Sequence, residues 1–290
     1  MGNVSYFTPT DTAITGLSFA SSSAVLSSAL HPSTAPFPIA VLHVSVIDST
    51  IGTESLSEAM HTALELDDVV SSSWLDTIVL QTALGMRKPE HLAVDRAFRM
   101  LLDRYHVRRI LLAENVRLSG SSWLNGIHID TVRPHDASVD LSGPYIARGT
   151  EDGGLDVYPV YRLYPDTYRT FVYGMYKPVD QWAKTEGVRY RTFRKMDRMG
   201  NLLIPVPSRM YGVAADGALA GRRIGVKGKS IGHGCATMLM QDLFDVKGVT
   251  TGAGSRAYAA LYGDARKTAS SLVTLEQLGG VFVGKTKTAS

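Results

Sequence analysis

LAGRRIGVK occupies residues 219–227, and DLFDVKGVTTGAGS occupies residues 242–255. The first segment ends in a short apolar run that predicts a strand from Ile224, and the glycines of the second predict a turn. A helix is predicted at Asp264–Leu278, where one face is apolar, and Gly279-Gly280 would end it. A second short strand follows at Val281–Val283. The sequence therefore predicts one strand–loop–helix–strand unit, which alone cannot cover both faces of a parallel sheet.

The order of these motifs resembles the opening of the amidase signature domain. That family has leucine-alanine-glycine, an apolar strand, valine-lysine-aspartate, a glycine-rich turn, a helix and a strand ending in glycine-lysine-threonine. The chain has these motifs in the same order, up to Gly284-Lys285-Thr286, when residues 228–241 are set aside. The resemblance implies that residues 209–290 are the incomplete start of an α/β amidase signature core, with an insert at 228–241.

The resemblance also implies a catalytic role for Lys227. Enzymes of this family hydrolyse amide carbon–nitrogen bonds with a serine, a second serine with a cis peptide, and the lysine of the Val-Lys-Asp motif. At that position, burial and polar neighbours would lower the pKa of Lys227 so that it can act as a base. It would take the proton of the bridging serine, which activates the nucleophilic serine for attack on the amide carbon. Backbone N–H groups in a glycine-rich loop would stabilise the oxyanion. On composition alone, Lys227 is a solvated lysine at a strand end.

The resemblance supplies Lys227 alone, because the segment that holds both serines of the family would lie beyond residue 290. Ser255 and Ser290 match neither serine, and Ser255 fits a turn. Lys285 and Lys287 end the second predicted strand, as surface or structural positions. We therefore expect residues 1–290 alone to be inactive. The full-length enzyme would act on a small-molecule amide, and no cofactor or metal is implied.

Residues 228–241 (GKSIGHGCATMLMQ) separate Lys227 from Asp242, which are adjacent in the family motif. The codons at the start of this segment can contain a splice donor, and those of Gln241 and Asp242 can contain an acceptor. We hypothesise a retained, very short intron, whose removal would restore Val-Lys-Asp. A P-loop is the weaker alternative, because Arg223 stands where that pattern requires glycine.

The histidines give weak indications of a site. His233 and Cys235 supply only two metal ligands, whereas a site needs three or four. His43 alternates within an apolar strand and fits a hydrogen-bonded core residue. His128 and Asp130 form a pair in a predicted loop.

Residues 36–208 are predicted to form an α+β accessory domain, preceded by a disordered lead-in at residues 1–35 that is rich in Ser, Thr, Ala and Pro. This region resembles the N-terminal region of fungal amidase-family proteins that are labelled scytalone dehydratase-like. The segments that carry the resemblance are Gly143-Pro144-Tyr145, residues 160–166 (VYRLYPD) and residues 206–209 (VPSR). No residue pattern indicates the chemistry of that dehydratase.

Within the accessory domain, a buried strand is predicted at Ile39–Ile47 and a helix from Thr53 or Ser55 to Leu64. Pro89-Glu90 is predicted to open a second helix. Other helices are predicted at residues 74–83 and from Asp166. The remaining strand candidates are residues 107–112, 143–146, 155–163 and 202–206.

The bulk composition excludes several classes of protein. The net charge of +3 and the scattered Lys and Arg indicate no nucleic-acid partner. No apolar run approaches the roughly 20 residues that span a bilayer, and the first residues lack the features of a signal peptide. Together with the single cysteine, this predicts a cytoplasmic protein without a membrane partner.

Two functions remain open on the sequence. The preferred one is an N-terminal fragment of an amidase signature hydrolase. The alternative is a non-catalytic α+β module that binds a ligand or a partner and carries a vestigial amidase tail.

Overall fold

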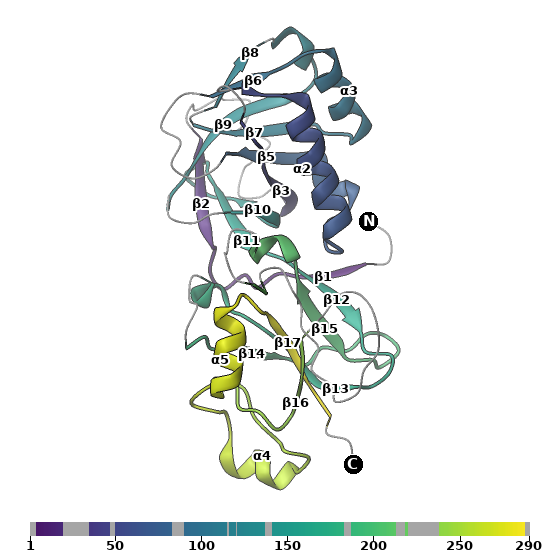
Figure 1. Cartoon of the computed structure of the whole chain (residues 1–290), viewed down its shortest axis with the longest axis vertical. Coiled ribbons are helices and arrows are strands. Elements are labelled where there is room, and N and C mark those ends of the chain that lie inside the picture. Colours follow the sequence, from purple (N-terminus) through teal and green to yellow (C-terminus); the bar gives the residue numbers. More distant parts are fainter. Residues whose placement is uncertain are drawn as a thin grey trace. The chain divides into compact units, whose positions relative to one another are not determined.

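The computed structural model describes residues 4–19, 35–46, 50–82, 90–114, 116–119, 121–136, 141–182, 187–212, 218–219 and 238–287. They form two compact units, which are described separately (Figure 1). One unit is Ala13–Pro159, and the other joins Met1–Thr12 to Val160–Ser290. The division differs from the predicted boundary at residue 208, because the strands after Val160 pair with strands near both ends of the chain.

A closed barrel of seven strands forms the unit Ala13–Pro159. Four adjacent strands run parallel to one another, and three strands with antiparallel pairing close the barrel. The parallel strands are β3 (Phe37–His43), β5 (Thr77–Gln81), β7 (Arg109–Ala113) and β9 (His128–Pro134). The closing strands are β2 (Thr15–Phe19), β10 (Gly143–Gly149) and β11 (Leu155–Pro159). Continuous buried runs such as Ile39–Leu42 fit parallel strands that are covered on both faces.

Among the described residues, a small parallel sheet and two α-helices complete this unit. The sheet has the order β4 (Thr50–Ile51), β6 (Glu90–Ala93), β8 (Val116–Ser119). The predicted first helix is confirmed as α2 (Thr53–Leu66). The predicted second helix begins later, as α3 (Arg96–Arg104), because residues 90–93 pair in the sheet and the Asp95 carboxylate accepts the Phe98 N–H at 2.7 Å.

The helix predicted at residues 74–83 is wrong. A short 3-10 helix at Ser72–Asp76 leads directly into β5, where Thr77–Leu80 are buried between β3 and β7. An apolar run of this length fits a buried strand as well as a helix, and the pairing on both sides decides for the strand.

The described part of the second unit contains two sheets and two α-helices. One sheet has the order β1 (Ser5–Phe7), β12 (Tyr161–Pro165), β15 (Leu203–Pro207). The other has the order β14 (Arg191–Phe193), β13 (Phe171–Tyr176), β17 (Phe282–Thr286), β16 (Met238–Gln241). The helices are α4 (Arg256–Tyr262) and α5 (Ser270–Gln277). The described part of the chain is therefore a mixed α/β protein with one seven-stranded barrel and four α-helices.

The described part of the predicted disordered lead-in forms strands. β1 pairs with β12, and β2 pairs with β9 and β11. The ring of Phe7 lies against those of Tyr161, Tyr176 and Phe193, with centroids 4.8–5.9 Å apart. This contact explains how a segment with few large apolar residues is held to the second unit.

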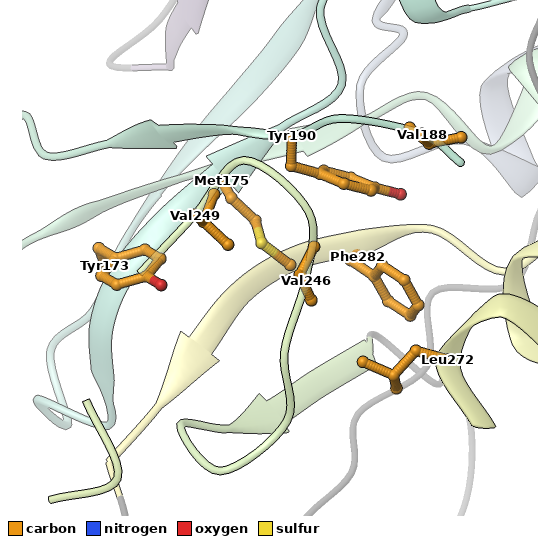
Figure 2. Packing of buried hydrophobic residues seen from close by; sticks show 8 residues of the cluster. All are labelled: Tyr173, Met175, Val188, Tyr190, Val246, Val249, Leu272 and Phe282. Atoms are coloured by element: carbon orange, nitrogen blue, oxygen red, sulfur yellow. The ribbon is translucent and has the colours of Figure 1, made fainter. Parts of the chain in front are cut away.

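A hydrophobic core of the second unit lies between the four-stranded sheet, the loop after β16 and α5 (Figure 2). Tyr173 and Met175 on β13 point toward Val246 and Val249 of the loop, and Phe282 on β17 packs there too. Leu272 closes the cluster from α5. The core therefore holds the residue 242–255 segment against β13 and β17.

None of the helices in the described ranges is long and apolar enough to cross a membrane.

Candidate functional site

The candidate site lies in the strand–loop–helix–strand unit between β16 and β17. These strands are parallel, with Met240 beside Lys285 and Gln241 beside Thr286. The second predicted strand is confirmed as β17, and the predicted helix is shorter, beginning at Ser270. The first strand of the unit is at Met238–Gln241, within the predicted insert, while the strand predicted from Ile224 lies outside the described residues.

Lys285 is the central charge of this unit. Its side chain is 0% exposed, and its ammonium group lies 3.4 Å from the Asp242 carboxylate. It donates hydrogen bonds to the Thr251 hydroxyl at 2.6 Å and to the Thr250 carbonyl at 3.0 Å. Burial lowers the pKa of Lys285, and the charges of Asp242 and Asp245 oppose that effect. The sequence predicts a surface or a structural position for Lys285, and the structure places it in a structural one.

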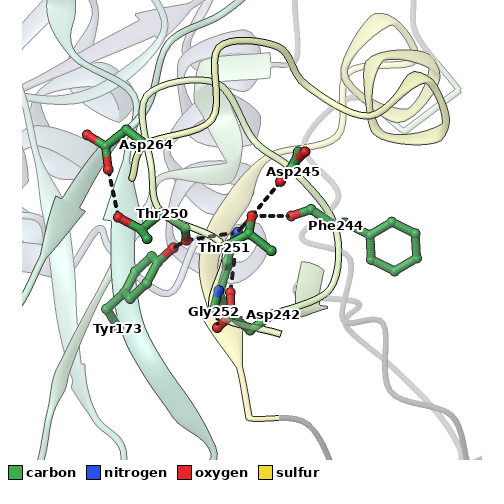
Figure 3. A network of polar contacts seen from close by, with 9 residues as sticks. Tyr173, Asp242, Phe244, Asp245, Thr250, Thr251, Gly252 and Asp264 are labelled. Carbon is green, nitrogen blue, oxygen red and sulfur yellow. Dashed lines mark hydrogen bonds and ion pairs between the residues drawn. The ribbon is translucent and has the colours of Figure 1, made fainter. Parts of the chain in front are cut away.

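Further hydrogen bonds fix the loop that surrounds this ammonium group (Figure 3). The Thr251 hydroxyl donates to Asp245 at 2.7 Å, and the Thr250 hydroxyl donates to Asp264 at 2.7 Å. The Tyr173 hydroxyl donates to the Thr250 carbonyl. The loop after β16 is therefore tied to β13 as well as to β17.

Asp242 joins both parts of the network. Its second carboxylate oxygen accepts the Gly252 N–H at 2.9 Å, and its carbonyl accepts the Ala253 N–H at 2.8 Å. A Cβ atom on Gly252 would lie 2.6 Å from that carboxylate oxygen. Glycine is therefore required here because the backbone approaches a buried carboxylate closely.

A cleft of about 540 Å³ opens beside this network. Three exposed cations line it, namely Arg194, Arg256 and Lys287. The Arg194 guanidinium lies 4.9 Å from the centre of the Tyr173 ring, which also lines the cleft. Lys287 is thus a surface position, in contrast to Lys285.

Ser255 also lines the cleft, where it serves as the N-cap of α4. Its hydroxyl accepts the Tyr258 N–H at 3.2 Å. This local role agrees with the prediction that Ser255 belongs to a turn. In the part of the chain that the structure describes, the Ser255 hydroxyl therefore has the role of a helix cap.

A second buried charge cluster contains Glu276, Lys177 and Tyr190. Burial raises the pKa of Glu276 to about 7, and the Tyr190 hydroxyl and the Lys177 charge oppose that effect. Burial lowers the pKa of Lys177 to about 8, and it also raises the pKa of Tyr190. This cluster is not among the sites predicted from the sequence. A signal was present, because Glu276 follows Leu272 by four residues and therefore shares the apolar face of α5.

The structure describes only some of the other predicted residues. Lys227, the predicted base, lies outside the described residues, as do Arg223, His233, Cys235 and Ser290. His43 lies 3.0 Å from the Leu141 carbonyl through Nε2, as expected for a hydrogen-bonded histidine.

His128 and Asp130 are on β9 rather than in a loop. Burial raises the pKa of Asp130, with the charges of Arg109 and His128 opposing it. Within the described ranges, no group of three or more His, Cys, Asp and Glu side chains is arranged to hold a metal ion.

No protein-family model matches the chain, and no solved structure matches it. The likeness to amidases therefore depends on the order of motifs in the sequence, and the site is defined by its own geometry.

Proposed function

We propose that this chain is the N-terminal part of an amidase signature hydrolase. The full-length enzyme would hydrolyse the carbon–nitrogen bond of a small-molecule amide by a Ser-cisSer-Lys mechanism. The observation that supports this most is the segment after Gln241, in which a glycine-containing loop, α4 and α5 lead into β17. β17 pairs in parallel with Met238–Gln241, whose place Ile224–Lys227 would take once residues 228–241 are removed. A strand–loop–helix–strand unit of this kind is what the order of motifs implies.

The surface of α4 gives separate support. None of its seven residues is buried, although Tyr258, Leu261 and Tyr262 are large and apolar. Leu261 is 76% exposed. A group of exposed apolar side chains on one short helix is typical of a surface that another part of a protein covers. Additional strands and helices of an amidase core would supply such a cover.

Lys227 is the proposed base of the full-length enzyme, and Lys285 is not. Lys285 is fully buried and its ammonium group is held by Asp242, Thr251 and the Thr250 carbonyl, so it cannot meet a substrate. Removing residues 228–241 would place Lys227 directly before Asp242, where Gln241 now stands beside Thr286. A lysine at that position would adjoin the ordered polar loop that contains Thr251 and Gly252, as the retained-intron hypothesis requires.

The experiment that tests the proposal is sequencing of the transcript from the codon of Val206 past that of Ser290. We expect a form in which Lys227 is joined to Asp242 and the frame continues into a segment with the two serines. Transcripts that all keep the segment 228–241 and stop after Ser290 would contradict the proposal.

Activity gives the second readout. We expect the purified chain of 290 residues to hydrolyse no simple amide, and the longer spliced protein to do so. In that longer protein, Lys227→Ala should lower the rate at least about a hundredfold, the usual minimum for loss of a general base. Amide hydrolysis by residues 1–290 alone would contradict the inference that both catalytic serines lie outside this segment.

The unit Ala13–Pro159 supports a second candidate function. Its closed barrel has its own buried core, so it can fold and bind a ligand or partner without the second unit. Hydrogen exchange of the whole chain with and without candidate ligands tests this function. Protection confined to barrel strands would favour a binding module over a truncated enzyme.

A further inference from the structure

The cleft beside α4 carries more positive than negative charge. Arg256 and Lys287 form no ion pair with any residue in the described ranges, and both are exposed. Arg194 adds a third cation, which the Tyr173 ring orients. The acidic side chain that lines the cleft, Asp242, is already neutralised by Lys285. Three cations therefore face a cleft in which the buried charges cancel.

Two more carboxylates lie near the cleft but are engaged elsewhere. Asp264 accepts the Thr250 hydroxyl, and Asp245 accepts the Thr251 hydroxyl. Neither carboxylate is among the residues that line the cleft. An anion that enters it would meet Arg194, Arg256 and Lys287 first.

The walls of the cleft are largely apolar. Val172, Ala259 and the ring of Tyr173 line it, together with Gly252 and Gly254. A volume of about 540 Å³ is in the range of pockets that bind small molecules. Apolar walls with a few convergent charged groups favour a ligand that has an apolar body and one anionic end.

We propose that this cleft binds a small organic carboxylate. Its carboxylate would pair with Arg256 and Lys287, and its apolar body would lie against Val172, Ala259 and the Tyr173 ring. Inorganic phosphate could use the cations but would gain nothing from the apolar walls. The site is independent of the proposed amide hydrolysis, because it uses neither Lys227 nor a serine nucleophile.

Ligand-observed NMR titration of the whole 290-residue chain with sodium benzoate tests the proposal. We expect saturable binding with a Kd on the order of 1 mM, typical of a small ligand with few contacts. At the same ionic strength, acetate and inorganic phosphate should bind at least about tenfold more weakly, because both lack an apolar body.

Two double variants locate the site. Arg256→Ala with Lys287→Ala should weaken benzoate binding at least about tenfold, a loss equivalent to about 1.4 kcal/mol. Arg266→Ala with Lys267→Ala is the matched control, because it removes the same charge from two exposed residues of the same unit that do not line the cleft. The control should bind benzoate as the unchanged chain does.

Three results would overturn the proposal. They are the absence of saturable benzoate binding, equal weakening in both double variants, and binding of acetate or phosphate as tight as that of benzoate. Thermal unfolding of both variants checks that each remains folded, which is expected because all four side chains are exposed.

Discussion

The ammonium group of Lys285 lies 3.4 Å from the carboxylate of Asp242, in a place where the two side chains are 0% and 8% exposed. A buried pair of this kind is expensive to desolvate, and it is kept in place by the hydrogen bonds around it. Here those bonds come from Thr251, the Thr250 carbonyl and the Gly252 N–H. The pair therefore fixes the conformation of the loop after β16.

Replacing Lys285 with Met should lower the free energy of unfolding by about 3–5 kcal/mol, because it leaves the Asp242 carboxylate buried without its partner. Lys287→Met is the matched control, since Lys287 is exposed two residues later, and it should change stability by less than about 0.5 kcal/mol. Urea unfolding measures both effects. The structural role of Lys285 would be refuted by equal, small losses in the two variants.

A double-mutant cycle tests the pair itself. Asp242→Asn should cost less in the Lys285→Met background than in the unchanged chain, because the charge that Asp242 balances is then gone. Additive effects would mean that Lys285 acts through Thr251 and the Thr250 carbonyl alone.

Glu276 should make stability fall as the pH rises from about 4.5 to about 7. The folded chain keeps the proton of Glu276 up to a pKa of about 7, whereas the ordinary value is 4.5. The unfolded chain therefore releases the proton first, and the folded state is penalised once the carboxylate is charged. Lys177 has the opposite effect on stability, and at higher pH, because its pKa is about 8 in the folded chain against an ordinary 10.5. Below pH 8 the buried, charged Lys177 lowers the stability of the folded chain. This loss is recovered as the pH rises from about 8 to 10.5, where the folded chain has released the proton and the unfolded chain still holds it.

Glu276→Gln should therefore stabilise the chain at pH 7.5 to 8 by an amount on the order of 2 kcal/mol, while leaving it nearly unchanged at pH 4. Unfolding by urea across this pH range gives the measurement. Glu58→Gln, on an exposed part of α2, is the control and should change the free energy of unfolding at pH 7.5 by less than about 0.5 kcal/mol. Parallel pH profiles for Glu276→Gln and the unchanged chain would show that the carboxylate is not penalised by burial.

The sequence predicts much of the barrel but not its order. The apolar runs at Ile39–Leu42 and Ile110–Leu112 identify buried strands directly, because a continuous apolar run suits a strand that is covered on both faces. The parallel order of β3, β5, β7 and β9 depends on pairing between residues far apart in the chain, which no local pattern reports.

The helix predicted from Asp166 fails for a local reason. The Asp166 carboxylate accepts the N–H groups of Thr170 and Phe171, at 2.9 and 2.7 Å. These bonds make a turn, after which Phe171–Tyr176 extends as β13. Aspartate is common both at helix N-caps and in turns, so the residue type alone does not distinguish the two.

The candidate site was predictable only in part. The segment 242–255 and the end of β17 were identified, but the burial of Lys285 was not, because all five residues of β17 are buried and the strand has no polar face. The cations of the cleft come from β17's end, from α4 and from Arg194, and only the folded chain brings them together.

The exposed apolar side chains of α4 should tolerate a charge. Leu261→Lys should change the free energy of unfolding by less than about 0.5 kcal/mol, because Leu261 is 76% exposed. Leu272→Ala on α5 is the contrast, and it should cost about 2–5 kcal/mol because Leu272 is buried in the core cluster. Leu261→Lys should also reduce self-association at high concentration, which light scattering measures. A large loss of stability would show that α4 is already packed within the chain.

Deletion of residues 228–241 gives the most direct test of how the unit between β16 and β17 is built. We expect the shortened chain to remain folded, because Ile224-Gly-Val-Lys227 can take the place that Met238–Gln241 hold beside β17. Both segments have a large apolar residue first and third and a long polar residue last. The shorter connection also lowers the entropy of the unfolded chain, so stability should be retained or increased. The control combines this deletion with Lys285→Met. If Asp242 keeps its place, Lys285→Met should lower the free energy of unfolding of the shortened chain by about 3–5 kcal/mol, as in the unchanged chain. A shortened chain that loses several kcal/mol, and in which Lys285→Met has no further effect, would mean that Met238–Gln241 are the native strand and that Lys227 does not adjoin Asp242.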